Sequence, residues 1–193
     1  MSASSHKILV HTCCTACASH VFSELTKAGF EVTAFFYNQE LEQTEYSQRL
    51  LGLRNYCDDN EVKLITPDYK PDEFNNVVAP FRDKNSLKYI NELDRFRRRR
   101  CLLCNSLVLQ KTIEQAKSSK VKFFTTTLLC SPYKNHDEII EISNDKALDY
   151  ELNFYYQDFR KGYWKGRNYA KNHQIISPSC CGCADSAKEG RLE

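Results

Sequence analysis

Residues 7–17 read KILVHTCCTAC, and this stretch decides the fold. Residues 7–11 are rich in apolar side chains, which predicts a buried strand. The strand runs directly into a CCxxC loop at residues 13–17, and apolar residues at helical spacing follow until Gly29. The chain therefore opens with a strand, a cysteine-bearing loop and a helix.

The rest of the chain repeats this alternation of strand and helix. Further strands are predicted at residues 32–37, 62–66, 121–130 and 152–159, and further helices at residues 41–60, 104–117, 135–148 and 167–173. Residues 71–100 are polar and helical at best. Strands that alternate with helices form parallel sheets with right-handed crossovers, so we expect one Rossmann-like α/β domain over residues 1–193, a parallel sheet with flanking helices.

Length and composition narrow the classes of protein. The chain has 193 residues, of which 41% are hydrophobic and 27% charged, values typical of a globular rather than a disordered protein. No apolar run approaches the length of a membrane span, and residues 1–7 lack the apolar segment of a signal peptide. We therefore expect a cytoplasmic protein without membrane contact.

Ten cysteines are many for a reducing compartment, and eight of them fall in tight clusters at residues 13–17, 101–104 and 180–183. Clustered cysteines there bind metal or perform redox chemistry more often than they form disulfide frameworks. Irregular spacings favour iron–sulfur ligation over paired zinc knuckles, although zinc and thiol redox chemistry stay open on the residues alone. Eight thiols exceed the four that one cubane cluster needs.

The order of elements predicts where the metal lies. In parallel sheets of this kind, ligands bind beyond the carboxyl ends of the strands, where the strand order reverses. The CCxxC loop follows the first predicted strand, and residues 131–134 (SPYK) follow a later strand and point to the same side. We therefore expect a metal where related folds place a nucleotide.

Five motifs together resemble one known family. They are the strand with its CCxxC loop, residues 100–104 (RCLLC), residues 125–134 (TTTLLCSPYK), residues 158–161 (DFRK) and residues 181–183 (CGC). In this order, over residues 7–186, they are similar to the epoxyqueuosine reductase QueH family. The resemblance implies a sheet of the adenine nucleotide alpha hydrolase-like type. It also implies a cobalamin-free iron–sulfur enzyme that reduces the epoxide of epoxyqueuosine in tRNA to the cyclopentene of queuosine.

The resemblance also implies the cofactor ligands. It assigns a [4Fe–4S] cluster to Cys13, Cys14, Cys101 and Cys104. Cys17 matches a position that the family fills with Cys or Asp, both of which bind iron.

The C-terminal cluster matches the family's CGC element at Cys181 and Cys183. These two residues are expected to be catalytic, either as ligands of a second, mononuclear iron or as a redox-active disulfide. The chain departs from the family at two positions: Thr12 stands where the family often has Cys, and Cys180 stands where it usually has Tyr. Cys180 is therefore the one clustered cysteine that is not expected to be a ligand.

The implied reaction consumes two electrons and two protons and releases water. A single [4Fe–4S] centre passes one electron in its usual couple, so two deliveries or a second redox centre are needed. An iron with open coordination would also serve as a Lewis acid for the epoxide oxygen.

A proton donor completes the requirements of this reaction. Sequence position nominates Tyr133 and Asp158 as catalytic residues, with Lys134 and Lys161 beside them. The alternative interpretation is structural: Asp158 caps or pairs with Arg160, and Tyr133 packs.

The expected partners are a tRNA with epoxyqueuosine at the anticodon wobble position and an electron donor of the ferredoxin or flavodoxin type. Five arginines within six residues directly precede the second cysteine cluster, and without them the net charge of +2 would be −3. Guanidinium groups suit phosphates, so these arginines are candidates for tRNA contact, with a solvated face as the alternative. They are Arg95, Arg97, Arg98, Arg99 and Arg100.

Two other functions compete with the reductase. One is a zinc-stabilised RNA-binding module without catalysis. The other is an ATP-using tRNA sulfur-transfer enzyme, against which the first loop argues because it lacks a Ser-Gly-Gly-rich phosphate cradle.

Two further residues, His11 and Trp164, each allow two interpretations, and two further cysteines have a structural one. His11 is expected either to donate a hydrogen bond to a sulfur or to pack at the strand end. Trp164 would stack on a loop base or cover the edge of the core. Cys57 and Cys130 are most simply buried small apolar residues.

Overall fold

The computed structural model describes residues 6–81 and 90–176. For residues 81 and 90–97 it describes the backbone but not the side chains. Within these residues, five parallel strands form one sheet in the order β3-β2-β1-β4-β5. They are β1 (His6–His11), β2 (Phe30–Phe35), β3 (Lys63–Ile65), β4 (Phe123–Thr126) and β5 (Asn153–Phe154). The expected α/β fold with a parallel, Rossmann-like sheet is confirmed.

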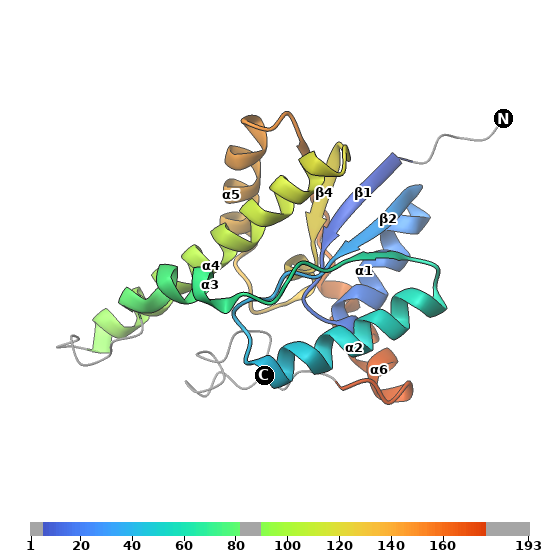
Figure 1. The fold of residues 1–193 in the computed structure, drawn as a ribbon, viewed down its shortest axis with the longest axis horizontal. Coiled ribbons are helices and arrows are strands. Elements are labelled where there is room, and N and C mark those ends of the chain that lie inside the picture. The colour runs from blue at the N-terminus through green and yellow to red at the C-terminus, as the bar shows by residue number, and fades with distance from the viewer. Residues whose placement is uncertain (1–5, 82–89, 177–193) are drawn as a thin grey trace.

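Helices cover both faces of the sheet. Figure 1 shows α1 (Thr15–Lys27), α2 (Gln43–Asp59) and α6 (Tyr163–Asn172) on one side and α4 (Ile90–Ser118) and α5 (His136–Leu148) on the other. The short α3 (Pro71–Val78) packs on α4. Three 3-10 turns complete the described elements: η1 (Ala79–Phe81), η3 (Thr127–Cys130) and η4 (Arg160–Gly162). No helix among the described residues is long and apolar enough to cross a membrane.

The alternation of side chains along β1 explains the two layers. Ile8 and Val10 point into a core shared with α1 and α2, whereas Leu9 joins a second core beside Phe35 and Phe124. All three β1 residues are completely buried. A strand that is apolar on both faces can only lie in the middle of a sheet covered on both sides. Because β1 is the central strand, the CCxxC loop that follows it lies in the middle of the row formed by the carboxyl ends of the strands.

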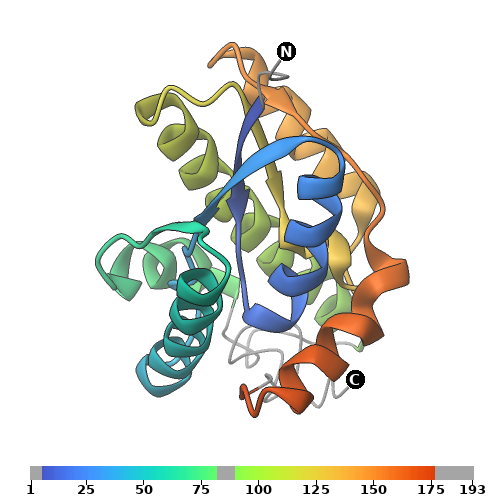
Figure 2. The same ribbon diagram turned by 90° about the vertical axis from the view of Figure 1, so that its right-hand side faces the viewer.

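Two glycines let α6 lie unusually close to α1, as Figure 2 shows from the side. A Cβ atom at Gly166 would lie 1.9 Å from the backbone oxygen of Ala16, and one at Gly162 would lie 1.8 Å from the His20 ring. Only glycine fits against the Ala16 backbone at position 166, whereas a side chain at position 162 would have to displace the His20 ring. Because Ala16 belongs to the CCxxC motif, the start of α6 is fixed against the cysteine loop.

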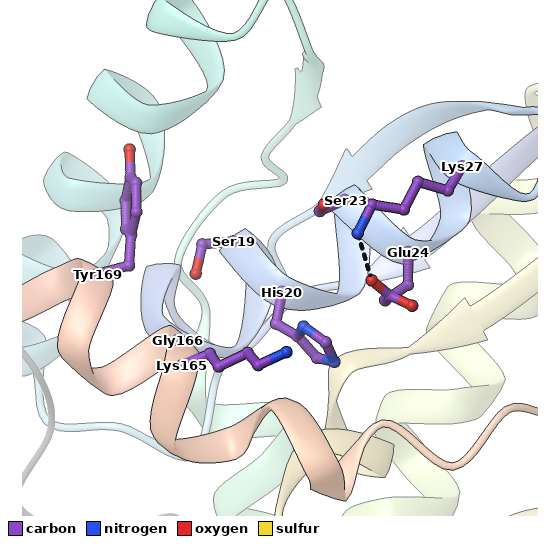
Figure 3. Close-up of a pocket in the computed structure, with 8 residues that line it drawn as sticks. All are labelled: Ser19, His20, Ser23, Glu24, Lys27, Lys165, Gly166 and Tyr169. Carbon is purple, nitrogen blue, oxygen red and sulfur yellow. Dashed lines mark hydrogen bonds and ion pairs between the residues drawn. The ribbon is translucent and has the colours of Figure 1, made fainter.

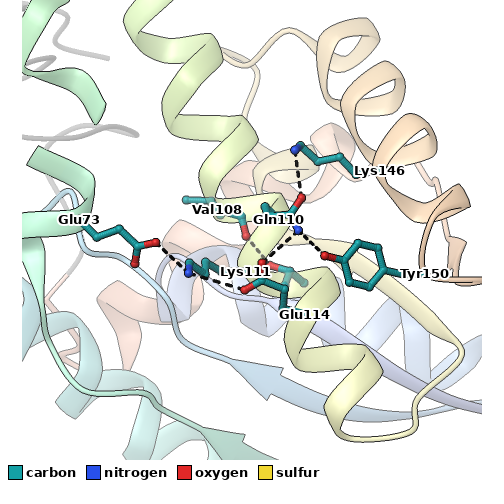
Figure 4. A network of polar contacts seen from close by, with 8 residues as sticks. Glu73, Val108, Gln110, Lys111, Glu114, Lys146 and Tyr150 are labelled. Atoms are coloured by element: carbon teal, nitrogen blue, oxygen red, sulfur yellow. Dashed lines mark hydrogen bonds and ion pairs between the residues drawn. The ribbon is translucent and has the colours of Figure 1, made fainter. Parts of the chain in front are cut away.

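Polar contacts hold α4 between its neighbours (Figure 4). Lys111 forms an ion pair with Glu73 of α3 at 2.8 Å. Gln110 donates to the hydroxyl of Tyr150 at 2.8 Å and accepts from Lys146 of α5 at 3.0 Å. The C-terminal half of α4 is thus tied to α3 on one side and to α5 on the other.

Three elements differ from the sequence predictions. α4 begins at Ile90 rather than at residue 104, so the second cysteine cluster lies inside a continuous helix. β4 ends at Thr126 rather than at residue 130, because the Thr126 hydroxyl accepts a hydrogen bond from the Leu128 amide and starts a 3-10 turn. β5 is reduced to Asn153–Phe154 at the edge of the sheet.

Candidate metal centre

The CCxxC loop occupies the point where the strand order reverses. β1 pairs with β2 on one side and with β4 on the other, and the chain crosses to β2 and to β4 over opposite faces. The cysteine loop therefore lies at the crevice where parallel sheets of this type bind ligands. The position predicted from the order of elements is confirmed.

Three thiols gather in this crevice. The sulfur atoms of Cys13, Cys14 and Cys17 lie within 4.8 Å of one another, and those of Cys13 and Cys14 are 3.9 Å apart. Each residue is at most 7% exposed. Cys14 is the N-cap of α1, where the helix dipole stabilises negative charge. The donor set therefore suits a thiophilic metal, and it is buried enough to exclude bulk water.

The protonation of these thiols explains why a cation belongs there. A hydrogen bond with Cys13 lowers the pKa of Cys14, but the hydrogen bond with Cys17, burial and the charge of Cys17 raise it well above its ordinary value. Hydrogen bonds with Cys13 and Cys130 and burial likewise raise the pKa of Cys17. Three neighbouring buried thiolates repel one another, and a bound metal ion removes that repulsion.

Thr127 connects the cysteine loop to the end of β4. Its hydroxyl accepts a hydrogen bond from the Cys13 amide at 3.0 Å and donates to the Cys13 sulfur at 3.2 Å. Thr127 is completely buried. Such a donor fixes the direction of the sulfur and withdraws charge from it. Thr127 lies in the TTTLLCSPYK motif, but the sequence alone does not reveal this role.

His11 serves the strand ends rather than a sulfur. Its Nδ1 lies 2.8 Å from the Thr126 hydroxyl and its Nε2 lies 3.1 Å from the backbone oxygen of Tyr37. Burial lowers the pKa of His11 to about 4. The neutral ring, with Nε2 donating to Tyr37 and Nδ1 accepting from Thr126, ties together the carboxyl ends of three adjacent strands. Of the two interpretations of His11, the packed one agrees with these contacts.

A buried cation faces the thiols from α2. Arg49 is 5% exposed and forms an ion pair with Glu45 one turn earlier in the helix. Burial opposes its charge, but negative charge at Cys14 and Glu45 more than offsets this and raises the pKa of the guanidinium. Arg49 therefore stabilises negative charge in the cysteine loop. Arg49 was not among the predicted site residues, and the only signal in the sequence is a Glu and an Arg four residues apart on a predicted helix.

Glu40 and Lys134 complete the charged surroundings. Glu40 follows β2, and burial raises the pKa of its carboxyl although Arg49 and Lys134 oppose the shift. Its Oε2 is buried and has no hydrogen-bond partner among the described residues. The loop after β2, which carries Glu40, is tied to the cysteine loop because the Asn38 side chain donates to the backbone oxygen of Thr12 at 3.0 Å.

The second cysteine pair lies on α4. Cys101 and Cys104, three residues apart, share one face of the helix, and both are partly buried. Cys104 lies within electrostatic range of Tyr37, which follows β2 at the same sheet edge as the cysteine loop. Among the described residues, the group of ligand atoms within 4.8 Å contains the first three cysteines and not this pair. The four-cysteine ligand set stays a prediction.

The nominated proton donors lie at the surface. Tyr133 is 56% exposed. Asp158 is exposed, and its carboxylate accepts from the Arg160 amide at 3.0 Å and from Arg160 Nε at 2.9 Å. The hydrogen bond to Arg160 holds the pKa of Asp158 well below its usual range. A carboxylate held ionised in this way cannot donate a proton near neutral pH, and these contacts match the alternative interpretation, in which Asp158 pairs with Arg160.

The basic run divides in the structure. Arg98 and Arg99 are exposed, whereas Arg100 is 4% exposed and thus turned away from solvent. Arg95 and Arg97 belong to α4, but the structure does not describe their side chains. Among the described side chains, Arg98 and Arg99 remain the candidates of this run for phosphate contact. Cys180, Cys181 and Cys183 lie outside the described residues.

Comparison with known proteins agrees with this site. The family model for "Epoxyqueuosine reductase QueH" matches residues 8–189. A curated protein of that name from Dehalococcoides mccartyi is 28% identical over 185 residues, which cover 95% of this chain and 93% of the relative. Relatives of the same name from Thermotoga maritima and Streptococcus pyogenes are 27% and 25% identical, over 95% and 94% of this chain and 92% and 70% of their own lengths. The chain belongs to the epoxyqueuosine reductase QueH family.

Proposed function

We propose that this protein reduces epoxyqueuosine in tRNA to queuosine with a [4Fe–4S] cluster held by Cys13, Cys14, Cys101 and Cys104. The observation that carries the proposal is the group of buried thiols at the sheet edge, in a chain that belongs to the QueH family. We further propose that Cys17, Cys181 and Cys183 serve a second iron, or that the last two form a redox-active disulfide.

The residues of the crevice fit an iron–sulfur cluster. Its ligands must be thiolates, and the thiols on the β1–α1 loop are buried and close together. The N-terminus of α1, the Thr127 hydroxyl and the Arg49 guanidinium each favour negative charge at that place. All three act before any substrate arrives, so the environment is preorganised for an electron-rich centre.

The chemistry assigns separate tasks to the cofactor and to the protein. Opening the epoxide to the alkene breaks two C–O bonds, takes up two electrons and two protons, and releases the oxygen as water. The bound cluster would supply electrons one at a time, from a donor of the ferredoxin or flavodoxin type. The protein must exclude water from the crevice, hold the nucleotide and deliver the protons.

The first experiment measures the metal. Protein purified anaerobically is expected to contain about four iron and four sulfide per chain, with further iron below one equivalent. Ala substitution of Cys101 or Cys104 should abolish the visible absorbance of the cluster. Cys57→Ala is the matched control, because Cys57 is 1% exposed on α2 and burial raises the pKa of its thiol to about 12. Stoichiometric zinc without sulfide would contradict the cluster and favour the zinc-stabilised alternative.

Cys17 decides how the thiols are divided. If Cys17 serves the second iron, Cys17→Ala keeps the four-iron cluster and loses only the additional iron. Loss of the cluster absorbance in Cys17→Ala would show that Cys17 replaces one of the four proposed ligands.

The second experiment measures turnover. Anaerobic holoenzyme and a chemical reductant should convert epoxyqueuosine-tRNA to queuosine-tRNA, which mass analysis of the nucleosides detects. Cys181→Ser and Cys183→Ser should each abolish conversion while the cluster absorbance survives, and Cys180→Ser should retain most activity. Equal loss in all three variants would contradict the proposed roles of the C-terminal cysteines.

A further inference from the structure

Two large aromatic side chains near the metal crevice lie open to solvent. Trp164 is 65% exposed and Tyr133 is 56% exposed. Both make edge-to-face contacts with the buried ring of Tyr163, at centroid distances of 5.2 Å and 6.1 Å. We call Tyr133, Tyr163 and Trp164 the aromatic platform. Of the two interpretations of Trp164, stacking on a loop base agrees better with this exposure.

The platform is held rigidly from both of its segments. The Tyr133 amide donates to the Ser131 hydroxyl at 3.2 Å, within a turn closed by the hydrogen bond from the Lys134 amide to the Ser131 carbonyl. On the other side, Gly162 of η4 and Gly166 of α6 lie close against α1. Exposed aromatic rings on a fixed backbone lose little conformational entropy when a ligand stacks on them.

The platform adjoins the metal centre. Tyr133 comes three residues after Cys130, and Cys130 is hydrogen-bonded to Cys17. Tyr163 packs in the same core cluster as the three thiols of the crevice. An RNA nucleotide that enters the crevice therefore brings the nucleotides next to it in the RNA close to the platform.

The surroundings of the platform are basic. Residues 159–176 contain five Lys or Arg side chains and no Asp or Glu. The Arg167 guanidinium lies 5.7 Å above the Tyr163 ring, and Lys161 and Lys165 are exposed. The acidic group nearest in sequence, Asp158, is neutralised by Arg160. The charge of this surface is complementary to a phosphate backbone.

A groove between α1 and α6 extends this surface (Figure 3). It has a volume of about 230 Å³ and is lined by Ser19 and Ser23 of α1, and the Lys165 side chain lies beside the His20 ring. Its one acidic side chain, Glu24, is paired with Lys27 at 2.8 Å. The Ser19 hydroxyl donates to the Ala16 carbonyl at 3.0 Å, so the Ser23 hydroxyl and the solvent-exposed Lys165 ammonium are the groups that suit a phosphate oxygen.

We propose that Tyr133 and Trp164 stack on the unpaired anticodon-loop bases that flank the reacting nucleotide, while Lys161 and Lys165 contact the adjoining phosphates. The inference rests on the proposed function and adds the surface that grips the RNA. A nucleotide can enter the crevice only if it leaves the base stack of the loop, and its neighbours then lose a stacking partner. The exposed rings replace that partner without reading the sequence.

The test uses anaerobic holoenzyme and an anticodon stem–loop RNA, with binding and turnover measured separately. Trp164→Ala should weaken binding about 5- to 150-fold, the range that a stacked base contributes, and Tyr133→Ala should weaken it in the same range. Trp164→Phe should restore most of the affinity, because a ring is still present. Leu148→Ala is the control, because Leu148 is 78% exposed on α5, away from the platform.

Two further readouts separate stacking from charge. Trp164 is the only tryptophan, so the stem–loop should change its fluorescence, whereas a fully paired duplex of the same stem should not. Replacing Lys161 and Lys165 with Ala should reduce the slope of log affinity against log salt by about 2, one unit for each lost phosphate contact.

Three results would overturn the platform. The first is unchanged RNA affinity in Trp164→Ala and Tyr133→Ala, and the second is equal fluorescence changes with stem–loop and duplex. The third is a defect that appears only with a protein electron donor and vanishes with a chemical reductant, which would make the surface a docking site for that donor. Binding through Trp164 without any epoxide reduction would instead refute the proposed function and leave the platform in place.

Discussion

At the scale of single residues, the crevice combines buried charges that would be costly without partners. Arg49 is stabilised by Glu45 and by negative charge in the cysteine loop. Glu40 is compensated only in part: Arg49 and Lys134 favour its charge, but burial prevails, and its Oε2 has no hydrogen-bond partner in the described part of the chain. Uncompensated burial favours the neutral form of a carboxyl group. We therefore expect that replacing Glu40 stabilises the protein and that replacing Arg49 weakens the metal site.

Glu40→Gln should therefore change stability in a pH-dependent manner. The folded-state pKa of Glu40 is raised above its unfolded value by burial, against the pull of Arg49 and Lys134 and with help from Glu45. The wild type thus has its full contribution from this group below pH 4.5 and loses it as the pH rises through the folded-state pKa. Near pH 5 the melting temperature of the variant should equal that of the wild type, and near pH 8 it should be higher than that of the wild type. A difference that shrinks as the pH rises would show that Arg49 and Lys134 hold Glu40 charged.

Arg49→Gln should weaken the metal site. It removes the cation that faces Cys14 and leaves Glu45 without its partner, so the thiolates of the cysteine loop lose a stabilising charge. We expect lower iron loading and a more negative reduction potential of the cluster, measured by metal analysis and by redox titration. Arg54→Gln, an exposed arginine of the same helix, is the control. Equal potentials in both variants would remove Arg49 from the electrostatics of the site.

At the scale of elements, the sequence predicted the sheet and most helices because their apolar patterns are local. The ends of β4 and α4 escaped prediction for physical reasons. Residues 127–130 have a strand-like composition, but the Thr126 side chain captures the Leu128 amide and turns the chain. The polar start of α4 lacks an apolar face that would reveal a helix. The crevice itself was predicted from cysteine spacing, whereas Thr127 and Arg49 gained meaning only from contacts distant in sequence.

The packing of α6 on α1 depends on one glycine. In Gly166→Ala the new methyl group would lie 1.9 Å from the Ala16 backbone oxygen, so the helices must separate. Such overpacking costs about 1–3 kcal/mol or more, and each kcal/mol lowers Tm by about 2–4 °C in a chain of this size. Asn168→Ala, an exposed change on the same helix, should leave Tm within about 1 °C. If Gly166→Ala melted like this control, the close approach of α6 to the cysteine loop would not exist in solution.

At the scale of the whole molecule, the proposed cluster would join the two layers of helices. Cys13 and Cys14 lie on the loop that leads to α1, while Cys101 and Cys104 lie on α4, across the sheet. The C-terminal half of α4 is already fixed by Lys111 and Gln110. Cys101 and Cys104 lie on the preceding turns of the same helix. Metal binding would therefore add an attachment between these turns and the cysteine loop that follows β1.

Removal of the metal should consequently loosen one half of one helix. In hydrogen exchange, the amides around residues 98–106 should exchange faster in the apoprotein than in the holoprotein. The amides of residues 110–118 should keep their protection, because the contacts of Lys111 with Glu73 and of Gln110 with Tyr150 do not involve the metal. Ala substitution of Cys101 should reproduce the apoprotein pattern, and Cys57→Ala should not. Equal protection of residues 98–106 with and without metal would mean that the α4 cysteines do not hold the cluster, whatever the iron content. Loss of protection along the whole of α4 would instead show that the metal supports the entire helix, and that the polar network alone is too weak to hold its C-terminal half.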